Sequence, residues 1–298
     1  MLVEIKFAKL VGVQNEDFNQ LDYNASLARE LAELPPETEP PSPNNPPWSG
    51  LMALGVWFLS VLAIFLFPVF FIAPYMIINR ERPIESFQTD NTAILLNLLA
   101  IVPAHLFTLA VAWFVATRNG KFSLGETLGF KSGSFRWWYY PLVLIAFFAI
   151  AGVVNYFIPE GDNELLKILR SSRAATYIIV ILATFTAPLV EEVVYRGIFY
   201  SALQRSIGVG GAIALVTFFF ALVHVPQYWG SPGTIILICL LSLVLTLIRW
   251  KSDNLLPCIV MHTIFNGLQS LFLVAEPYLP KMETAVQDQA AAIIKLLT

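Results

Sequence analysis

Six polar side chains stand inside apolar stretches of this chain, at spacings that suit acid–base chemistry. A charged side chain at the centre of a membrane helix costs about 2.5–3.5 kcal/mol on insertion scales, so a cluster of them indicates a function. Carboxyl, imidazole and amide groups in apolar surroundings predict a buried reaction centre. The six residues are Glu191, Glu192, Arg196, His224, His262 and Asn266.

Helical geometry separates the two adjacent glutamates. Glu192 and Arg196 are four residues apart, so their side chains share one face of a helix and can form an ion pair. Glu191 is turned from Glu192 by about 100°, so we expect it to face another partner and to be the candidate general base. The alternative for these residues is a structural ion-pair cluster that holds two helices together.

The histidines and the asparagine offer hydrogen-bond donors. His262 and Asn266 are also four apart, and their N–H groups could stabilise a developing oxyanion. The alternative is a polar contact between transmembrane helices. His224 follows Phe220 by four residues, and this ring could pack beside the imidazole. His105 has no carboxylate or amide companion nearby in sequence, and we interpret it as structural.

Several other hydrolytic chemistries lack their sequence patterns. There is no His-Glu-x-x-His zinc pattern and no Gly-x-Ser-x-Gly nucleophile pattern. No aspartate lies inside an apolar span, which argues against a paired-aspartate protease.

Composition identifies the elements that must position these groups. The 298 residues are 57% hydrophobic and 13% charged, whereas soluble domains are about 25% charged. A span needs about 20 apolar residues, so we predict an all-α, polytopic membrane bundle of about seven transmembrane helices, with a range of six to eight. The net charge of −3 gives no basic surface for nucleic acid. The predicted spans are residues 51–78, 92–117, 137–158, 174–203, 210–226, 233–250 and 254–275.

The remaining segments flank the bundle. Residues 1–34 form a polar, acidic N-terminal segment, and residues 35–50 form a Pro-rich linker. Seven of the 19 prolines fall within 35–47, which predicts an extended, semi-rigid spacer. The bundle covers 51–275, and 276–298 is a C-terminal tail.

Loop charges indicate the orientation of this integral, multi-pass chain. If the spans alternate, seven basic residues fall on the side of the N-terminus and five on the other, which favours a cytoplasmic N-terminus. The first group is Arg118, Lys121, Lys131, Arg136, Arg205, Arg249 and Lys251, and the second is Arg80, Arg82, Lys167, Arg170 and Arg173.

At its polar positions the chain resembles the CAAX-protease and bacteriocin-processing family, which includes the type II CAAX prenyl (Ras-converting) endopeptidase. The family patterns Glu-Glu-x-x-x-Arg, Phe-x-x-x-His and His-x-x-x-Asn occur here in order on separate spans. They begin at Glu191, Phe220 and His262. The resemblance covers about residues 120–275, the expected protease core.

The resemblance implies an endopeptidase that works within the bilayer. Glu191 with His224 would activate a water for attack on the scissile carbonyl, and His262 with Asn266 would stabilise the oxyanion.

The same resemblance implies supporting and cofactor roles. Glu192 and Arg196 would organise the site, with Phe220 beside them. We expect no cofactor, because an asparagine side chain suits an oxyanion better than a metal. The zinc-dependent alternative would use Glu191, His224 and His262 as ligands.

The expected partners are membrane lipids and a membrane-tethered or lipidated peptide substrate. Two other functions stay open. Glu and His side chains within membranes also form the relays of proton- or cation-coupled transporters. A non-catalytic scaffold that retains the fold is the third hypothesis.

Overall fold

Helices make up the whole regular structure of the part of the chain that is described. The computed structural model describes residues 40–130, 135–159, 161 and 163–275. Apart from one isolated bridge between Ser42 and Asn45, every regular element in those ranges is helical, which confirms the all-α prediction. The predicted polar segment 1–34, residues 35–39 of the predicted linker and the tail 276–298 lie outside the described residues.

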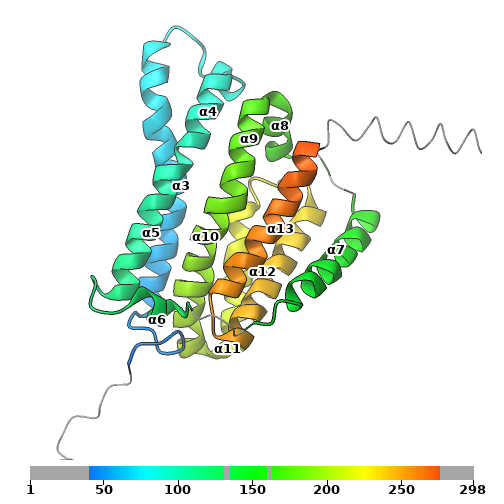
Figure 1. The fold of residues 1–298 in the computed structure, drawn as a ribbon. Helices are drawn as coiled ribbons and strands as arrows, with labels where there is room; N and C mark the ends of the chain where they lie inside the picture. The colour runs from blue at the N-terminus through cyan, green and yellow to red at the C-terminus, as the bar shows by residue number, and fades with distance from the viewer. Residues whose placement is uncertain (1–39, 131–134, 160, 162, 276–298) are drawn as a thin grey trace, which may run out of the picture. The chain divides into compact units, whose positions relative to one another are not determined.

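Long apolar helices dominate the order of elements (Figure 1). The first half contains α3 (Gly50–Ile78), the 3₁₀ turn η1 (Ile84–Gln88), α4 (Asn91–Leu99), α5 (Ile101–Thr117), α6 (Leu124–Leu128) and α7 (Tyr139–Phe157). The second half contains α8 (Glu164–Ser171), α9 (Arg173–Ile181), η2 (Leu182–Thr186), α10 (Ala187–Glu192), η3 (Val193–Phe199), α11 (Tyr200–His224), α12 (Pro232–Ser252) and α13 (Leu256–Ala275).

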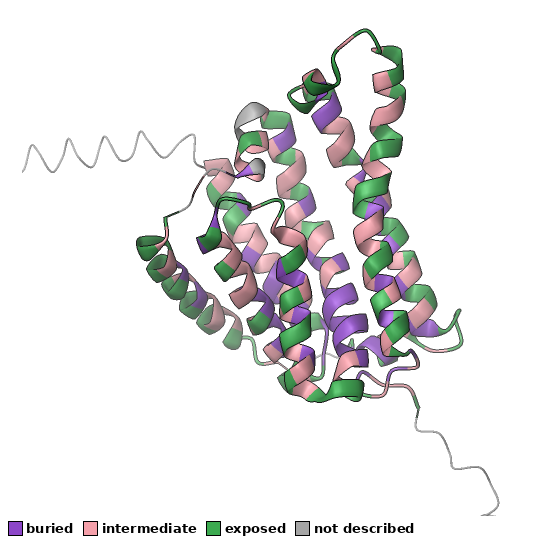
Figure 2. Ribbon diagram, turned by 180° about the vertical axis from the view of Figure 1, so that it is seen from behind, coloured by how far each residue is buried: buried purple, intermediate pink, exposed green. Residues whose placement is uncertain are grey.

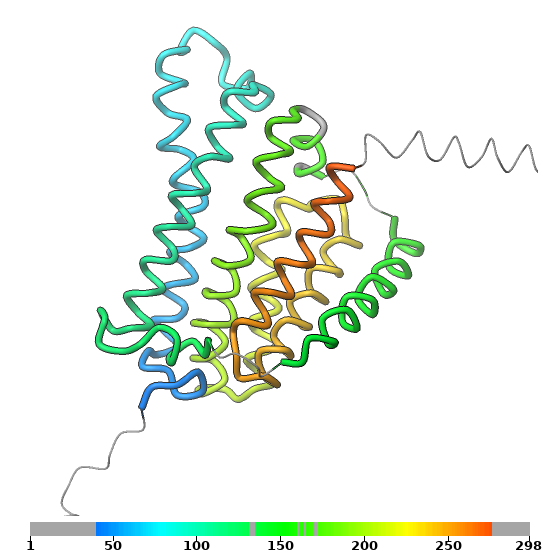
Figure 3. The backbone as a smooth tube through the Cα atoms, in the orientation of Figure 1, coloured from blue at the N-terminus to red at the C-terminus, as the bar shows by residue number. Residues whose placement is uncertain are grey.

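Six helical stretches of the described residues are long and apolar enough to cross a membrane, one fewer than the best estimate of seven. The difference lies in Arg173–His224, a stretch of 52 residues that contains two of the predicted spans. Gly208 interrupts it with φ 79° and ψ 167°, a conformation that side-chain-bearing residues rarely adopt. Two helices are joined at this kink, so the two predicted spans meet without a loop. The yellow-green part of the tube in Figure 3 turns back at the lower end of the bundle.

Burial is concentrated around the second half of the chain (Figure 2). One core cluster includes Val194, Ile198 and Phe220, and a second includes Leu245 and Phe265. Helix α7 packs against the second cluster and otherwise shows mostly exposed positions. The turn η3, which carries Arg196, is buried at all seven of its residues.

The path from α9 to α11 departs twice from α-helical geometry. The turns η2 and η3 are π-helical, and the six-residue helix α10 lies between them. Single π turns inside α-helices occur frequently at functional sites. Here they bracket the two glutamates.

Residues 41–49, which we call the strap, lie against one end of the bundle. The indole of Trp48 donates to the carbonyl of Ile198 at 2.9 Å, and Arg118 and Arg205 donate to strap carbonyls at 2.9 and 3.1 Å. Ser49 then caps α3 by accepting from the Met52 amide. This part of the predicted linker is thus fastened to the helices.

Asp90 at the start of α4 gives a pH-dependent prediction. Its carboxylate accepts from the Ala93 amide at 3.0 Å and from Arg82 at 2.9 Å, and these bonds lower the pKa of Asp90 below its usual value. A lowered pKa in the folded state stabilises the protein above the unfolded value of about 3.9, and this contribution is lost as pH falls through the folded value.

We therefore expect Asp90→Ala to lower the thermal unfolding midpoint at neutral pH, with the difference from the parent shrinking under acid conditions. Midpoints measured across the pH range in detergent test this, with Glu81→Ala at an exposed position as the control. A difference that stays constant down to acid pH would contradict the assignment.

Candidate active site

The centre of the polar cluster is the buried carboxylate of Glu192. Its Oε1 accepts from Arg196 Nη1 at 2.8 Å, which is the ion pair that the spacing predicts. The same oxygen lies 2.7 Å from His262 Nδ1, so this ring nitrogen carries the hydrogen and donates to the carboxylate. All three side chains are buried. Glu192 therefore connects α10 to η3 and to α13.

Besides Glu192, the Arg196 side chain contacts residues of α12 and α11. Its Nη2 donates to the backbone carbonyl of Ser242 at 3.0 Å and to the Ser242 hydroxyl at 2.8 Å. Its Nε donates to the Thr246 hydroxyl at 3.3 Å. The guanidinium carbon also lies 4.7 Å from the centre of the Phe220 ring. These contacts fix the cation that neutralises Glu192.

Glu191 points away from that ion pair, as its helical position predicts. Its side chain is 26% exposed, whereas that of Glu192 is fully buried. Glu191 Oε2 lies 3.8 Å from His262 Nε2, which is too long for a direct hydrogen bond. A single water oxygen can lie within about 2.8 Å of both atoms at this separation. His262 is thus hydrogen-bonded to Glu192 through Nδ1, while its Nε2 faces Glu191 without a direct bond.

His224 has a defined tautomer. Its Nδ1 lies 2.6 Å from the carbonyl of Phe220, and a carbonyl can only accept, so Nδ1 carries the hydrogen. Nε2 of the neutral ring is then an acceptor. The rings of His224 and His262 lie 4.7 and 6.2 Å from the ring of Phe220, so one benzene ring is flanked by both imidazoles. Within the described residues no hydrogen bond or ion pair joins His224 to Glu191.

Asn266 is anchored to the first π turn. Its Nδ2 donates to the carbonyl of Ala183 at 2.9 Å, and the amide group has a second hydrogen that can serve a substrate oxygen. One turn further along α13, Ser270 accepts from the Thr184 hydroxyl at 3.0 Å. The residue that the sequence offers as an oxyanion donor therefore also fastens α13 to η2.

His105 also contacts this π turn. Its Nδ1 lies 3.0 Å from the hydroxyl oxygen of Thr186, and that hydroxyl donates to the Leu182 carbonyl. This contact fits the structural role expected for His105.

The residues of the zinc alternative do not form a metal site as they are placed. Among the described residues, no group of three or more His, Cys, Asp or Glu side chains is arranged to hold a metal ion. His262 uses Nδ1 on Glu192, and His224 uses Nδ1 on its own helix, so each ring has only Nε2 to offer.

Sequence reasoning missed several residues that support the cluster. Ser242 and Thr246 are four apart in an apolar span, and this spacing was the available signal. Trp57 donates to the Tyr195 hydroxyl at 3.0 Å and so joins α3 to η3. Arg249, counted in the sequence with the loop charges, is only 1% exposed, so its side chain lies inside the bundle and not in a loop.

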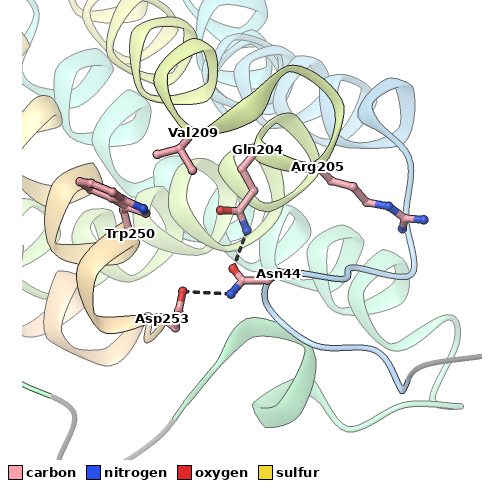
Figure 4. Close-up of a pocket in the computed structure, with 6 residues that line it drawn as sticks. All are labelled: Asn44, Gln204, Arg205, Val209, Trp250 and Asp253. Carbon is pink, nitrogen blue, oxygen red and sulfur yellow. Dashed lines mark hydrogen bonds between the residues drawn. The ribbon is translucent and has the colours of Figure 1, made fainter.

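A surface pocket of about 310 Å³ lies elsewhere, at the strap end of the bundle (Figure 4). Neither glutamate, no histidine and no asparagine of the predicted site lines it. The lining residues are Asn44, Gln204, Arg205, Val209, Trp250 and Asp253.

A comparison with protein-family models matches the part of the chain that carries the polar cluster. Residues 173–268, which run from the start of α9 into α13, match the family model described as Type II CAAX prenyl endopeptidase Rce1-like. The matched segment contains both glutamates, Arg196 and all four predicted catalytic residues. No curated protein and no solved structure gave a match.

Proposed function

We propose that this multi-pass membrane chain, whose residues 173–268 belong to the Rce1-like family of proteases, is an endopeptidase that cleaves peptides at the membrane. One observation supports this proposal most directly. Of two adjacent glutamates, Glu192 is locked between Arg196 and His262, whereas Glu191 is partly exposed beside the free nitrogen of His262. A carboxylate without its own cation next to an imidazole can accept a proton from water.

The proposed reaction starts with a water held near Glu191. Glu191 takes one proton as the water oxygen attacks the scissile carbonyl carbon, and His224 Nε2 is the second acceptor that can orient this water. The carbonyl oxygen becomes an oxyanion, which the second Nδ2 hydrogen of Asn266 stabilises. In the protonated imidazole, His262 Nε2 is a further donor.

The tetrahedral intermediate then breaks its bond to nitrogen. The proton held by Glu191 passes to the leaving amine, which restores the carboxylate and releases a new carboxyl terminus and a new amino terminus. Throughout, Arg196 stays on Glu192 and supplies a fixed positive charge near the developing negative one. No step requires a resident metal, and metal independence is part of the proposal.

The proposed substrates are membrane-tethered or lipidated peptides. The cluster lies on helices that are apolar enough to be membrane-embedded, so a substrate attached to the same bilayer reaches it without leaving the lipid. The family name refers to prenylated CAAX ends, and we include such ends among the candidate substrates.

The proposal is tested with protein purified in detergent and reconstituted in vesicles. A library of membrane-tethered peptides, with and without a farnesylated C-terminal cysteine, is incubated with the protein, and the products are located by mass spectrometry. We expect one internal peptide bond to be cut at a rate that a zinc chelator does not change. Loss of cleavage with the chelator, and its return with added zinc, would contradict the metal-independent mechanism.

The transporter alternative makes an opposite prediction in the same vesicles. Intact peptides together with substrate-driven proton or cation flux would replace the protease assignment. Intact peptides without flux would favour the non-catalytic scaffold.

A further inference from the structure

The second π turn, η3, has carbonyl groups that are satisfied by side chains from outside its helix. A π turn shifts backbone hydrogen bonds from the fourth to the fifth residue, so some carbonyls near its ends need other partners. Arg249 Nε donates to the carbonyl of Arg196 at 3.1 Å. Trp48 Nε1 donates to the carbonyl of Ile198 at 2.9 Å. One donor comes from α12 and the other from the strap.

An arginine is an unusual hydrogen-bond donor to a buried backbone carbonyl such as that of Arg196. Arg249 is almost completely buried, and within the described residues it forms no ion pair with a carboxylate. Its Nη2 donates to the Ser201 hydroxyl at 3.3 Å, whereas its Nη1 has no hydrogen-bond partner. A buried cation is costly, so a neutral donor would be expected if only one carbonyl needed a partner.

Several hydrogen bonds of the strap hold Trp48 beside η3. Asn44 accepts from Gln204 at 2.6 Å and donates to Asp253 at 3.1 Å, and Figure 4 shows both bonds at the rim of the pocket. Arg205 and Arg118 hold the carbonyls of the two prolines that precede Trp48. The strap is therefore tied to α11 and to the residues that follow α5 and α12.

A short chain of contacts connects these donors to the polar cluster. Arg249 holds the backbone of Arg196, the Arg196 side chain holds Glu192, and Glu192 holds Nδ1 of His262. The free nitrogen of His262 faces Glu191. A displacement of the Arg196 backbone is thus passed through two hydrogen bonds to the imidazole.

We propose that Arg249 and Trp48 are positioning residues, which hold η3 so that Arg196, Glu192 and His262 keep their alignment with Glu191. This inference rests on the proposed protease function for its kinetic consequence, but its structural consequence can be measured without any activity. Among the described residues, the side-chain hydrogen bonds of both residues go to Ile198, Arg196 and Ser201 and not to Glu191, His224 or Asn266. Trp48 lies outside the segment that matches the family model, so the strap contributes to a site in the matched helices.

The kinetic test compares Arg249→Met, which removes all donors, with Arg249→Gln, which keeps an uncharged donor. We expect Arg249→Met and Trp48→Phe to lower kcat about 10–100-fold with little change in KM, because a small displacement of reacting groups is costly. Arg249→Gln should recover part of the loss. Lys251→Met and Trp137→Phe, at exposed positions, are the matched controls.

The second readout is the Nδ1–H signal of His262 in ¹⁵N-histidine NMR spectra, which is tractable because the chain has three histidines. A His262→Gln spectrum assigns the signal. We expect Arg249→Met to broaden or shift it, while the His105 signal stays in place as evidence of folding and Lys251→Met changes neither.

The possible results separate the two proposals. An unchanged His262 signal and an unchanged kcat in both Arg249→Met and Trp48→Phe would overturn the positioning roles and leave the protease assignment intact. A parent protein that cuts no peptide would remove the protease assignment, while a shifted His262 signal would still support the positioning roles. If Arg249→Met does not fold, Arg249→Gln and Trp48→Phe decide the question.

Discussion

Glu191→Gln should lower kcat for peptide cleavage by about 10²–10⁴-fold, the range expected when a general base is removed. Glutamine has almost the same size and shape as glutamate, so the helix packing should persist. Its amide cannot take a proton from water, and the nearby His262 would lose the carboxylate that its Nε2 faces at 3.8 Å. Initial rates on the reconstituted protein measure the effect, and unfolding midpoints check the fold.

The matched control for this variant is Glu81→Gln. Glu81 lies after α3, with a side chain that is 92% exposed, and its exposed ion pair with Arg80 spans 3.6 Å. We expect this variant to cleave at the parental rate. If Glu191→Gln also cleaves at the parental rate, Glu191 is not the base, and the proposed mechanism is wrong.

Arg196→Met should reduce the free energy of unfolding by about 3–5 kcal/mol, because removing one partner of a buried ion pair leaves an uncompensated charge. Glu192 would remain in a fully buried position with only His262 beside it. The Ser242 and Thr246 groups that bond Arg196 would lose their partner as well. Denaturant unfolding in detergent gives the value.

A double-mutant cycle tests the cause of that loss. Glu192→Leu with Arg196→Met replaces both charges by apolar side chains, so we expect the double variant to be more stable than Arg196→Met alone. Equal losses in Arg196→Met and in the double variant would mean that the unpaired Glu192 charge is not the cause, and that the cost lies in the lost packing and in the lost hydrogen bonds to Ser242 and Thr246.

Local spacing was enough to predict one half of the site. Glu192 and Arg196 lie on one continuous helical segment, so their separation of four residues brings them into contact, even though a π turn begins between them. The hydrophobic pattern likewise located the helices, because length and apolar composition alone identify a span. Both predictions needed only information within a single helix.

The contact between Glu192 and His262 was beyond the reach of the sequence. It depends on the position and the rotation of α13 relative to α10. Packing between helices sets both, and the two bonded residues are 70 positions apart in the sequence. The sequence had paired His262 with Asn266 because they share a face of one helix. In the structure that face meets two neighbours, and each residue bonds a different one.

The strap and Arg249 show a second limit. Prolines predict an extended chain but not what that chain lies against, since its hydrogen bonds are made by its carbonyls and by one indole. Arg249 sits near the end of an apolar span, where an arginine usually extends to the interface. Here it turns inward and donates to the Arg196 carbonyl in η3 and to the Ser201 hydroxyl.

The kink at Gly208 joins the helical stretch of the two glutamates to the helix of His224 without a connecting loop. Adding a Cβ at Gly208 would meet no neighbouring atom, so the constraint is the backbone conformation and not space. One residue inserted after it would rotate Phe220 and His224 by about 100° relative to His262. We therefore expect insertions and deletions at this connection to be as harmful as changes in a catalytic segment, although the connection contains no reactive group.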